Sequence, residues 1–227
     1  MNSEKCILFS DEEYPSQLKE ITNPPKQLNC IGNIELLKEK NIIAIIGSRE
    51  ANEEAINKTY ELARELSGKG YVIVSGGAKG IDAAAHKGAL ENKGKTIAIL
   101  GSGFKHMYPE ENIELFKKIS EQGLLISEYD ENFLGSKYSY LDRNRITSGL
   151  SNGIIIMAGS YKGGSISQIN LAHKQKKVIM YPNDMKIYPN EGFEIVKEKY
   201  NGRKISNVED IMEYVKEKRI QSIINYF

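Results

Sequence analysis

The stretch Val72–Asp82 constrains the fold of this chain more than any other. The β-branched run Val72-Ile73-Val74 stops at Ser75-Gly76-Gly77, and an alanine-rich helical pattern follows Lys79-Gly80. A strand, a glycine turn and a helix start gather backbone N–H groups and the positive end of a helix at one point, which suits a phosphate. A tight turn that binds nothing is the alternative, and this stretch alone leaves it open.

The same alternation of apolar strand and helical pattern runs through most of the chain. We expect strands at Ile42–Ile46, Tyr71–Val74, Thr96–Leu100, Leu124–Ile126, Gly153–Met157 and Val178–Tyr181, and helices at Glu53–Lys69, Ile81–Leu90, Glu110–Glu121, Asp142–Leu150 and Ser165–Lys174. Apolar strands that alternate with helices predict an α/β fold, a Rossmann-like open parallel sheet with helices on both faces. Because crossovers are right-handed, the turns after the strands converge at one edge of the sheet, where open α/β sheets bind ligands.

The remaining segments suggest one domain with two additions. We expect residues 1–40 to be a short leader that packs on the main domain, residues 41–185 to be the Rossmann-like domain, and residues 186–227 to be a small helical tail of the same domain. The tail should end in a helix at Val208–Tyr226, whereas 130–140 and 183–202 have no clear periodicity.

Composition excludes several classes of protein. The formal net charge of +1 argues against a global basic field, so any polyanion must meet local positive charge. Cys6 and Cys30 are too few for a disulfide framework, and the 3 histidines show no metal-ligand spacing. No signal peptide or apolar run of membrane-spanning length is visible, so we expect a cytoplasmic protein that binds no membrane and no metal.

Cations follow several of the predicted strands. They are Arg49, Lys79, Arg143, Arg145 and Lys162. Guanidinium and ammonium groups on one edge can hold a run of phosphates. Each could instead cap a helix or pair with an acid such as Asp82, Glu128 or Asp142.

The segment Lys137-Tyr138-Ser139-Tyr140 places aromatic side chains beside these cations. Aromatic rings next to positive charge are what single-stranded nucleic acids bind, since every base offers a π-face. Packing of the tyrosines on the sheet edge is the alternative.

Known nucleotide and catalytic motifs are absent. Neither a G-x-G-x-x-G fingerprint nor a Walker A loop occurs, which argues against a dinucleotide oxidoreductase and an NTPase, and we predict no cofactor. Asp82 and His86 lie one helical turn apart, but a capping aspartate and a structural histidine explain them equally well. We therefore predict no catalytic residue and no enzymatic activity.

Ordered motifs resemble one family. The segments Ala44–Arg49, Ser75–His86, Gly123–Tyr129, Arg143–Ser151 and Lys162–Ser167 occur in the order seen in the bacterial DNA-processing family DprA, also called Smf. Tyr14-Pro15 and Pro24-Pro25 are also similar to this family. The resemblance covers about Tyr14 to Pro182.

The resemblance implies a Rossmann-like homodimer that binds single-stranded DNA without sequence specificity, protects incoming DNA in natural transformation and helps to load the RecA recombinase. Such proteins are not enzymes. By motif position, the residues implied to contact DNA are Arg49, Lys137, Tyr140 and Lys162, those implied to form a phosphate pocket are Gly47, Ser48, Gly76, Gly164 and Ser165, and Arg143 and Arg145 match an Arg-Asn-Arg motif.

Two other functions stay open at this point. The chain is also similar to phosphoribohydrolases with a P-G-G-x-G-T-x-x-E signature, but Gln168 stands where their catalytic Glu is expected, and an amide cannot act as that acid or base. A module that senses a free mononucleotide in the same pocket is the third possibility.

Overall fold

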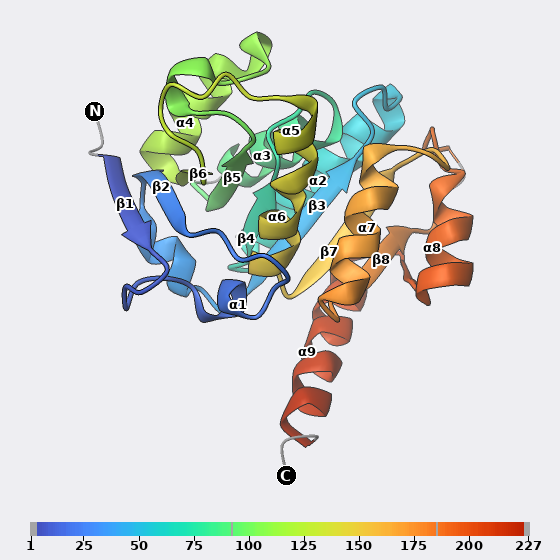
Figure 1. Ribbon diagram of the computed structural model, residues 1–227. Helices are drawn as coiled ribbons and strands as arrows, with labels where there is room; N and C mark the ends of the chain where they lie inside the picture. Colours follow the sequence, from blue (N-terminus) through green and yellow to red (C-terminus); the bar gives the residue numbers. More distant parts are fainter. Residues whose placement is uncertain (1–3, 92, 185, 225–227) are drawn as a thin grey trace.

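A computed structural model describes residues 4–91, 93–184 and 186–224, and within them the strands form one nine-stranded sheet. Its order is β1-β2-β6-β5-β4-β3-β7-β8-β9 (Figure 1). All neighbours from β6 to β9 in this order run parallel, and β2 pairs antiparallel with both β1 and β6. The predicted α/β class and the parallel centre of the sheet are confirmed.

The elements have the following bounds. The strands are β1 (Glu4–Leu8), β2 (Gln27–Gly32), β3 (Ile42–Gly47), β4 (Val72–Ser75), β5 (Thr96–Leu100), β6 (Leu124–Ser127), β7 (Gly153–Ala158), β8 (Val178–Pro182) and β9 (Arg203–Ile205). The helices are α1 (Ser16–Lys19), α2 (Glu53–Gly68), α3 (Ile81–Glu91), α4 (Ile113–Gln122), α5 (Lys137–Asp142), α6 (Asn144–Leu150), α7 (Gly164–Lys174), α8 (Gly192–Tyr200) and α9 (Val208–Ile224), with 3-10 helices at η1 (Ile34–Lys38), η2 (Phe104–His106) and η3 (Glu110–Asn112).

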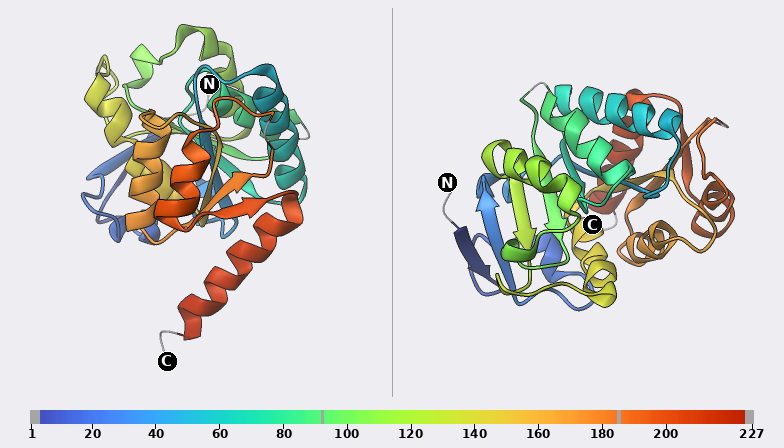
Figure 2. Two further views of the ribbon diagram at one scale, coloured as in Figure 1. Left: turned by 90° about the vertical axis from the view of Figure 1, so that its right-hand side faces the viewer. Right: turned by 90° about the horizontal axis from the view of Figure 1, so that it is seen from above.

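Helices cover both faces of the sheet. Seen from above, α2, α3 and α4 lie on one side of the strands, and α5, α6, α7 and α8 lie on the other (Figure 2). The central strands β4, β5 and β6 are buried along their whole length, as expected for strands with two covered faces. In α2 the buried residues Ala55, Thr59, Ala63 and Leu66 form a single stripe, and the Asn52 side chain caps the helix start.

The order of the strands creates a topological switch point beside β3. The chain moves from β3 through β4 and β5 to β6 on one side, and then returns to place β7 and β8 on the other side of β3. Crossover helices leave from opposite faces at such a point, so a crevice opens between the ends of the two neighbouring strands. The turns after β3 and β7 border this crevice.

The N-terminal segment is more than a packed leader. It contributes β1 and β2 to the sheet, and Asn29 and Cys30 in β2 pair with Ser127 and Ile126 in β6. The sequence did not predict these strands, because a short antiparallel edge strand has no continuous apolar run and its partner in β6 is distant in the chain.

Two segments without clear periodicity also contain regular structure. The stretch 130–140 ends in α5, whose first turn is stabilised by a reciprocal Ser136–Ser139 capping box. The stretch 183–202 contains α8. The next element in the chain, β9, pairs in parallel with β8. The last helix, α9, projects away from the body of the sheet (Figure 2), and the final residues of the predicted Val208–Tyr226 helix lie outside the described residues. Among the described residues, no helix combines the length and apolar character that crossing a membrane requires.

Candidate nucleic-acid interface

A groove of about 490 Å³ lies at the switch point, lined by the turns after β3 and β7 and by the start of α5. A recess of about 30 Å³ adjoins it above the turn after β4. The predicted site residues that line one or both are Gly47, Ser48, Arg49, Gly76, Lys79, Lys137, Tyr140, Arg143, Gly164 and Ser165. Residues up to about 118 positions apart in the chain therefore meet at one edge of the sheet, as parallel strand topology requires.

The cations in and beside the groove differ in whether an acidic side chain already pairs with them. Arg49 and Lys137 are exposed, and neither has a hydrogen bond or an ion pair with any residue that the structure describes. Lys79 is held by Glu111 at 2.5 Å. Lys162 does not line the groove, but it is exposed in the same turn as Gly163, which does. Arg49 and Lys137 are thus the cations in the groove that are available to an anionic ligand, and Lys162 lies beside the groove.

Gly76 is required by the side chain of Arg143. A Cβ atom at position 76 would lie 1.4 Å from Nη1 of Arg143, so only glycine leaves space for the guanidinium. Gly80 has φ +74°, and a Cβ atom there would lie 2.5 Å from the Ser48 carbonyl oxygen. These two glycines let the turns after β3 and β4 pack closely against each other and against α5.

Arg143 forms part of the floor of the groove. Its guanidinium donates to the carbonyl oxygens of Ile99 at 2.9 Å and Tyr140 at 3.2 Å, and it lies 3.9 Å from the Asp82 carboxylate. Burial lowers the pKa of Arg143, while the negative charge of Asp82 opposes that shift. The same burial raises the pKa of the Asp82 carboxyl. Arg143 ties α5 and α6 to β5, and its charge adds to the potential below Arg49.

Arg145 is not brought to the groove. It is 5% exposed, and Glu128 accepts two hydrogen bonds from its guanidinium, each 2.6 Å long. A third goes to the Asn23 carbonyl oxygen at 2.7 Å. Arg145 therefore joins α6 to the end of β6 and to the N-terminal segment, and it does not line the groove.

Two tyrosine rings stand at the rim of the groove. The centroids of Tyr108 and Tyr140 are 5.8 Å apart, and the rings are tilted by 54°. Tyr108 is 52% exposed, and Tyr138 on the same helix as Tyr140 is 83% exposed. The sequence reasoning missed Tyr108, although it lies in the turn region after β5 and so at the same sheet edge.

The histidine and aspartate of α3 do not form a catalytic pair. His86 is fully buried, and its Nδ1 lies 2.8 Å from the Thr96 hydroxyl. That hydroxyl donates to the Ile73 carbonyl oxygen, so Nδ1 of His86 is the donor in their contact. Burial lowers the pKa of His86 to about 3. The Asp82 carboxylate accepts instead from the Ala78 N–H at 3.2 Å, and no cluster of metal-ligating side chains occurs among the described residues.

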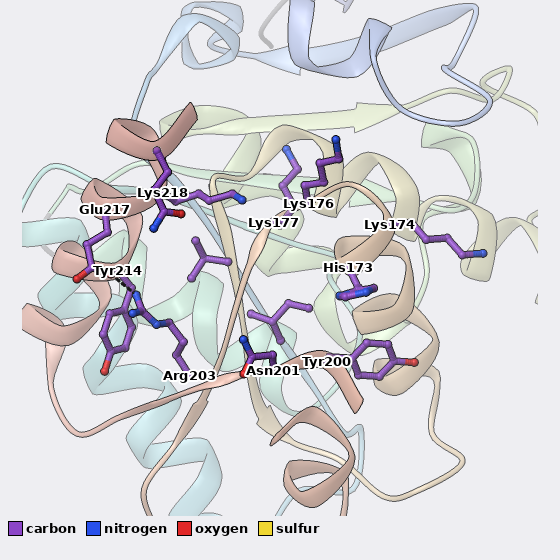
Figure 3. A pocket seen from close by; sticks show the side chains of 13 residues that line it. His173, Lys174, Lys176, Lys177, Tyr200, Asn201, Arg203, Tyr214, Glu217 and Lys218 are labelled. Atoms are coloured by element: carbon purple, nitrogen blue, oxygen red, sulfur yellow. Dashed lines mark hydrogen bonds and ion pairs between the residues drawn. The ribbon is translucent and has the colours of Figure 1, made fainter. Parts of the chain in front are cut away.

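A second groove of about 770 Å³ lies at the opposite edge of the sheet, where β8 begins (Figure 3). His173, Lys174 and Lys176 border it at the end of α7, and Figure 3 shows Arg203 beside Glu217 and Tyr214. Basic side chains at the end of a helix offset its dipole, which accounts for this cluster without a ligand.

Comparisons with known proteins agree with the resemblance seen in the motifs. The sequence profile of the family described as DNA recombination-mediator protein A matches residues 5–216. The chain is 35% identical over 216 residues to the DNA processing protein DprA of Bacillus subtilis, a match that covers 95% of this chain and 72% of that protein.

Two solved structures have the same fold over most of the chain. The DNA processing protein A of Helicobacter pylori, described for its single-stranded DNA binding mode, superposes with a TM-score of 0.85 at 32% identity and covers 96% of this chain and 97% of its own. The corresponding protein of Streptococcus pneumoniae gives a TM-score of 0.86 at 30% identity and covers 92% of this chain and 73% of its own.

Proposed function

The chain belongs to the DNA recombination-mediator protein A family, and from this premise we propose that it binds single-stranded DNA without sequence preference. The observation that carries the proposal is the groove at the switch point. There the unpaired cations Arg49 and Lys137 lie beside the rings of Tyr108 and Tyr140. The Helicobacter pylori relative, described as binding single-stranded DNA, supports the same ligand.

Each part of the groove has a role in this proposal. Arg49 and Lys137 in the groove and Lys162 beside it neutralise successive phosphates. The start of α7 adds backbone N–H groups and the positive end of its helix dipole. The rings of Tyr108 and Tyr140 stack on bases, and stacking tolerates any sequence. A duplex hides its base faces, so we expect weaker binding to double-stranded DNA.

We further propose the cellular role that the resemblance implies. The protein protects incoming single strands in natural transformation, helps to load the RecA recombinase, and acts in the cytoplasm as a homodimer without catalytic activity. The description of the family as recombination mediators supports this assignment.

A titration tests the proposal directly. Fluorescence anisotropy with labelled dT oligonucleotides of several lengths, and with a matched duplex, is measured over a range of salt, alongside the molecular mass in solution. We expect tighter binding to single strands, affinity that falls steeply with salt, and the mass of a dimer. Equal affinity for duplex and single strand would contradict base stacking at the two tyrosines.

The alternatives make different predictions in the same assay. A mononucleotide sensor would release the oligonucleotide when free nucleotide is added at low concentration. A phosphoribohydrolase would liberate free base from a nucleoside monophosphate, and the amide of Gln168 in place of a carboxylic acid argues against that reaction.

A further inference from the structure

The first turn of α7 borders the groove with unused hydrogen-bond donors. The N–H groups of Gly164 and Ser165 have no acceptor among the described residues. The hydroxyl of Ser165 lines the groove and has no hydrogen bond to any described residue. Gly164 carries no side chain, so its backbone N–H is accessible from the groove.

Gln168 lies one turn further along this helix and is the unusual residue there. It is only 6% exposed, yet its side chain lines the groove. No hydrogen bond joins its carboxamide to any described residue, and its Nε2 is buried. Side chains of a helix tilt toward the helix N-terminus, which brings this carboxamide over the turn that contains Gly164 and Ser165.

A buried amide without a partner is costly to the free protein. The next buried residues of the same helix, Ile169 and Ala172, are apolar, and an apolar side chain at position 168 would avoid the cost of desolvating an amide. Buried polar groups in native proteins almost always have partners. The partner missing here therefore points to a ligand in the groove.

Resting on the proposed function, we infer that Gln168 donates a hydrogen bond to a phosphodiester of single-stranded DNA seated on the start of α7. The same phosphate accepts from the N–H groups of Gly164 and Ser165 and from the Ser165 hydroxyl. The terminal torsion of glutamine is broad, so a half-turn presents either the oxygen or the NH₂ group to the groove. A carboxylate at this position could only accept, and its charge would repel the phosphate.

Three variants test this inference with a labelled dT oligonucleotide. Gln168→Met keeps the length of the side chain but removes the donor, Gln168→Glu keeps the shape but adds charge, and Ser167→Ala is the control at an exposed neighbour outside the groove. We expect Gln168→Met to weaken binding about tenfold, the low end of the range for a hydrogen bond to a charged group. Gln168→Glu should weaken it further, and Ser167→Ala should not change it.

Two further readouts separate a ligand contact from a structural role. Because Gln168 is neutral, Gln168→Met should leave the slope of affinity against salt unchanged. Because it removes an unpartnered buried amide, the variant should melt at the same temperature as the unaltered chain or higher. A lower melting temperature that accompanies weaker binding would show a structural partner for the amide and overturn the inference.

The remaining outcomes are also decisive. If Gln168→Met binds within twofold of the unaltered chain while Arg49→Ala binds weakly, the inference fails and the proposed function stands. If the unaltered chain does not bind dT oligonucleotides, the proposed function and this inference fail together.

Discussion

Arg49 lies in the turn after β3, is exposed, and has no ion pair with any residue in the described part of the chain. Its guanidinium is therefore free to bind a phosphate. We expect Arg49→Ala to weaken binding of single-stranded DNA about tenfold to a hundredfold, the range for hydrogen bonds to charged groups. The slope of log affinity against log salt concentration should be smaller by about one for this variant, as expected for the loss of one phosphate contact.

Lys174→Ala is the matched control for this prediction. Lys174 is an exposed cation in the groove at the opposite edge of the sheet, so its removal changes the net charge equally. The affinity of the Lys174→Ala variant for single-stranded DNA should equal that of the unaltered chain. Equal losses in the two variants would mean that binding responds to overall charge and not to the groove at the switch point.

His86 makes the stability of the protein depend on pH. Burial lowers its pKa to about 3, whereas the unfolded chain titrates near the ordinary value of 6.5. Protons therefore bind to the unfolded state as the pH falls below 6.5, and the contribution of the neutral folded histidine is lost progressively down to about pH 3. Between pH 7 and 5 we expect the free energy of unfolding to fall by about 2 kcal/mol from this group.

Urea denaturation at pH 7, 6 and 5 measures that change. The window above pH 5 lies largely above the titration of ordinary carboxyl groups. The buried Asp82 carboxyl, whose pKa is raised, changes stability in the opposite direction, so a fall in the free energy of unfolding is assigned to the histidine. A free energy of unfolding that is constant over this range would contradict the burial of a neutral imidazole.

At the scale of elements, Arg145 holds three separate segments together. Its guanidinium joins α6 to Glu128 beyond β6 and to Asn23 of the N-terminal segment. Its backbone carbonyl also accepts from the Gln175 side chain at 3.0 Å. The Arg-Asn-Arg motif thus serves two purposes, since Arg143 faces the groove and Arg145 faces the packed side of α6.

Glu128→Gln tests this structural role. It removes the charge of Glu128 and one of its two hydrogen bonds from the buried guanidinium and leaves only the half-exposed Asp142 carboxylate, 3.1 Å away, as a counter-charge. We therefore expect the free energy of unfolding to fall by up to about 3 kcal/mol. The affinity of the folded variant for single-stranded DNA, measured without denaturant, should not change. A selective loss of DNA binding with unchanged stability would instead assign Arg145 to the interface.

At the scale of the whole molecule, the N-terminal segment forms one edge of the sheet. Removal of residues 1–40 takes away β1 and β2, leaves the edge of β6 unpaired, and strips the buried side chains of Leu18 and Leu28 from the core. We expect the shortened chain to aggregate or to lose cooperative thermal unfolding, observed by circular dichroism and light scattering. Cooperative melting within a few degrees of the full chain would make the segment an accessory and not part of the domain.

The sequence alone predicted the central strands, their parallel arrangement and the edge of the sheet at which the groove lies. These features depend on local periodicity and on the handedness of crossovers, which a run such as Ile42–Ile46 followed by Gly47 expresses within a few residues. Most of the predicted site residues meet in the groove for the same reason, because topology places the turn after every parallel strand at one edge.

Only the tertiary structure decided which of the predicted cations are free and which are structural. Arg49 and Arg145 are the same residue type and both follow a predicted strand or helix start in the sequence. In the structure, however, Arg145 donates hydrogen bonds to Glu128, 17 residues away, and to Asn23, 122 residues away. The sequence also did not predict three other features, which are the antiparallel strand β2, the position of the Tyr108 ring and the unpartnered amide of Gln168. Each of these features depends on contacts between segments far apart in the chain, and the local sequence pattern does not predict such contacts.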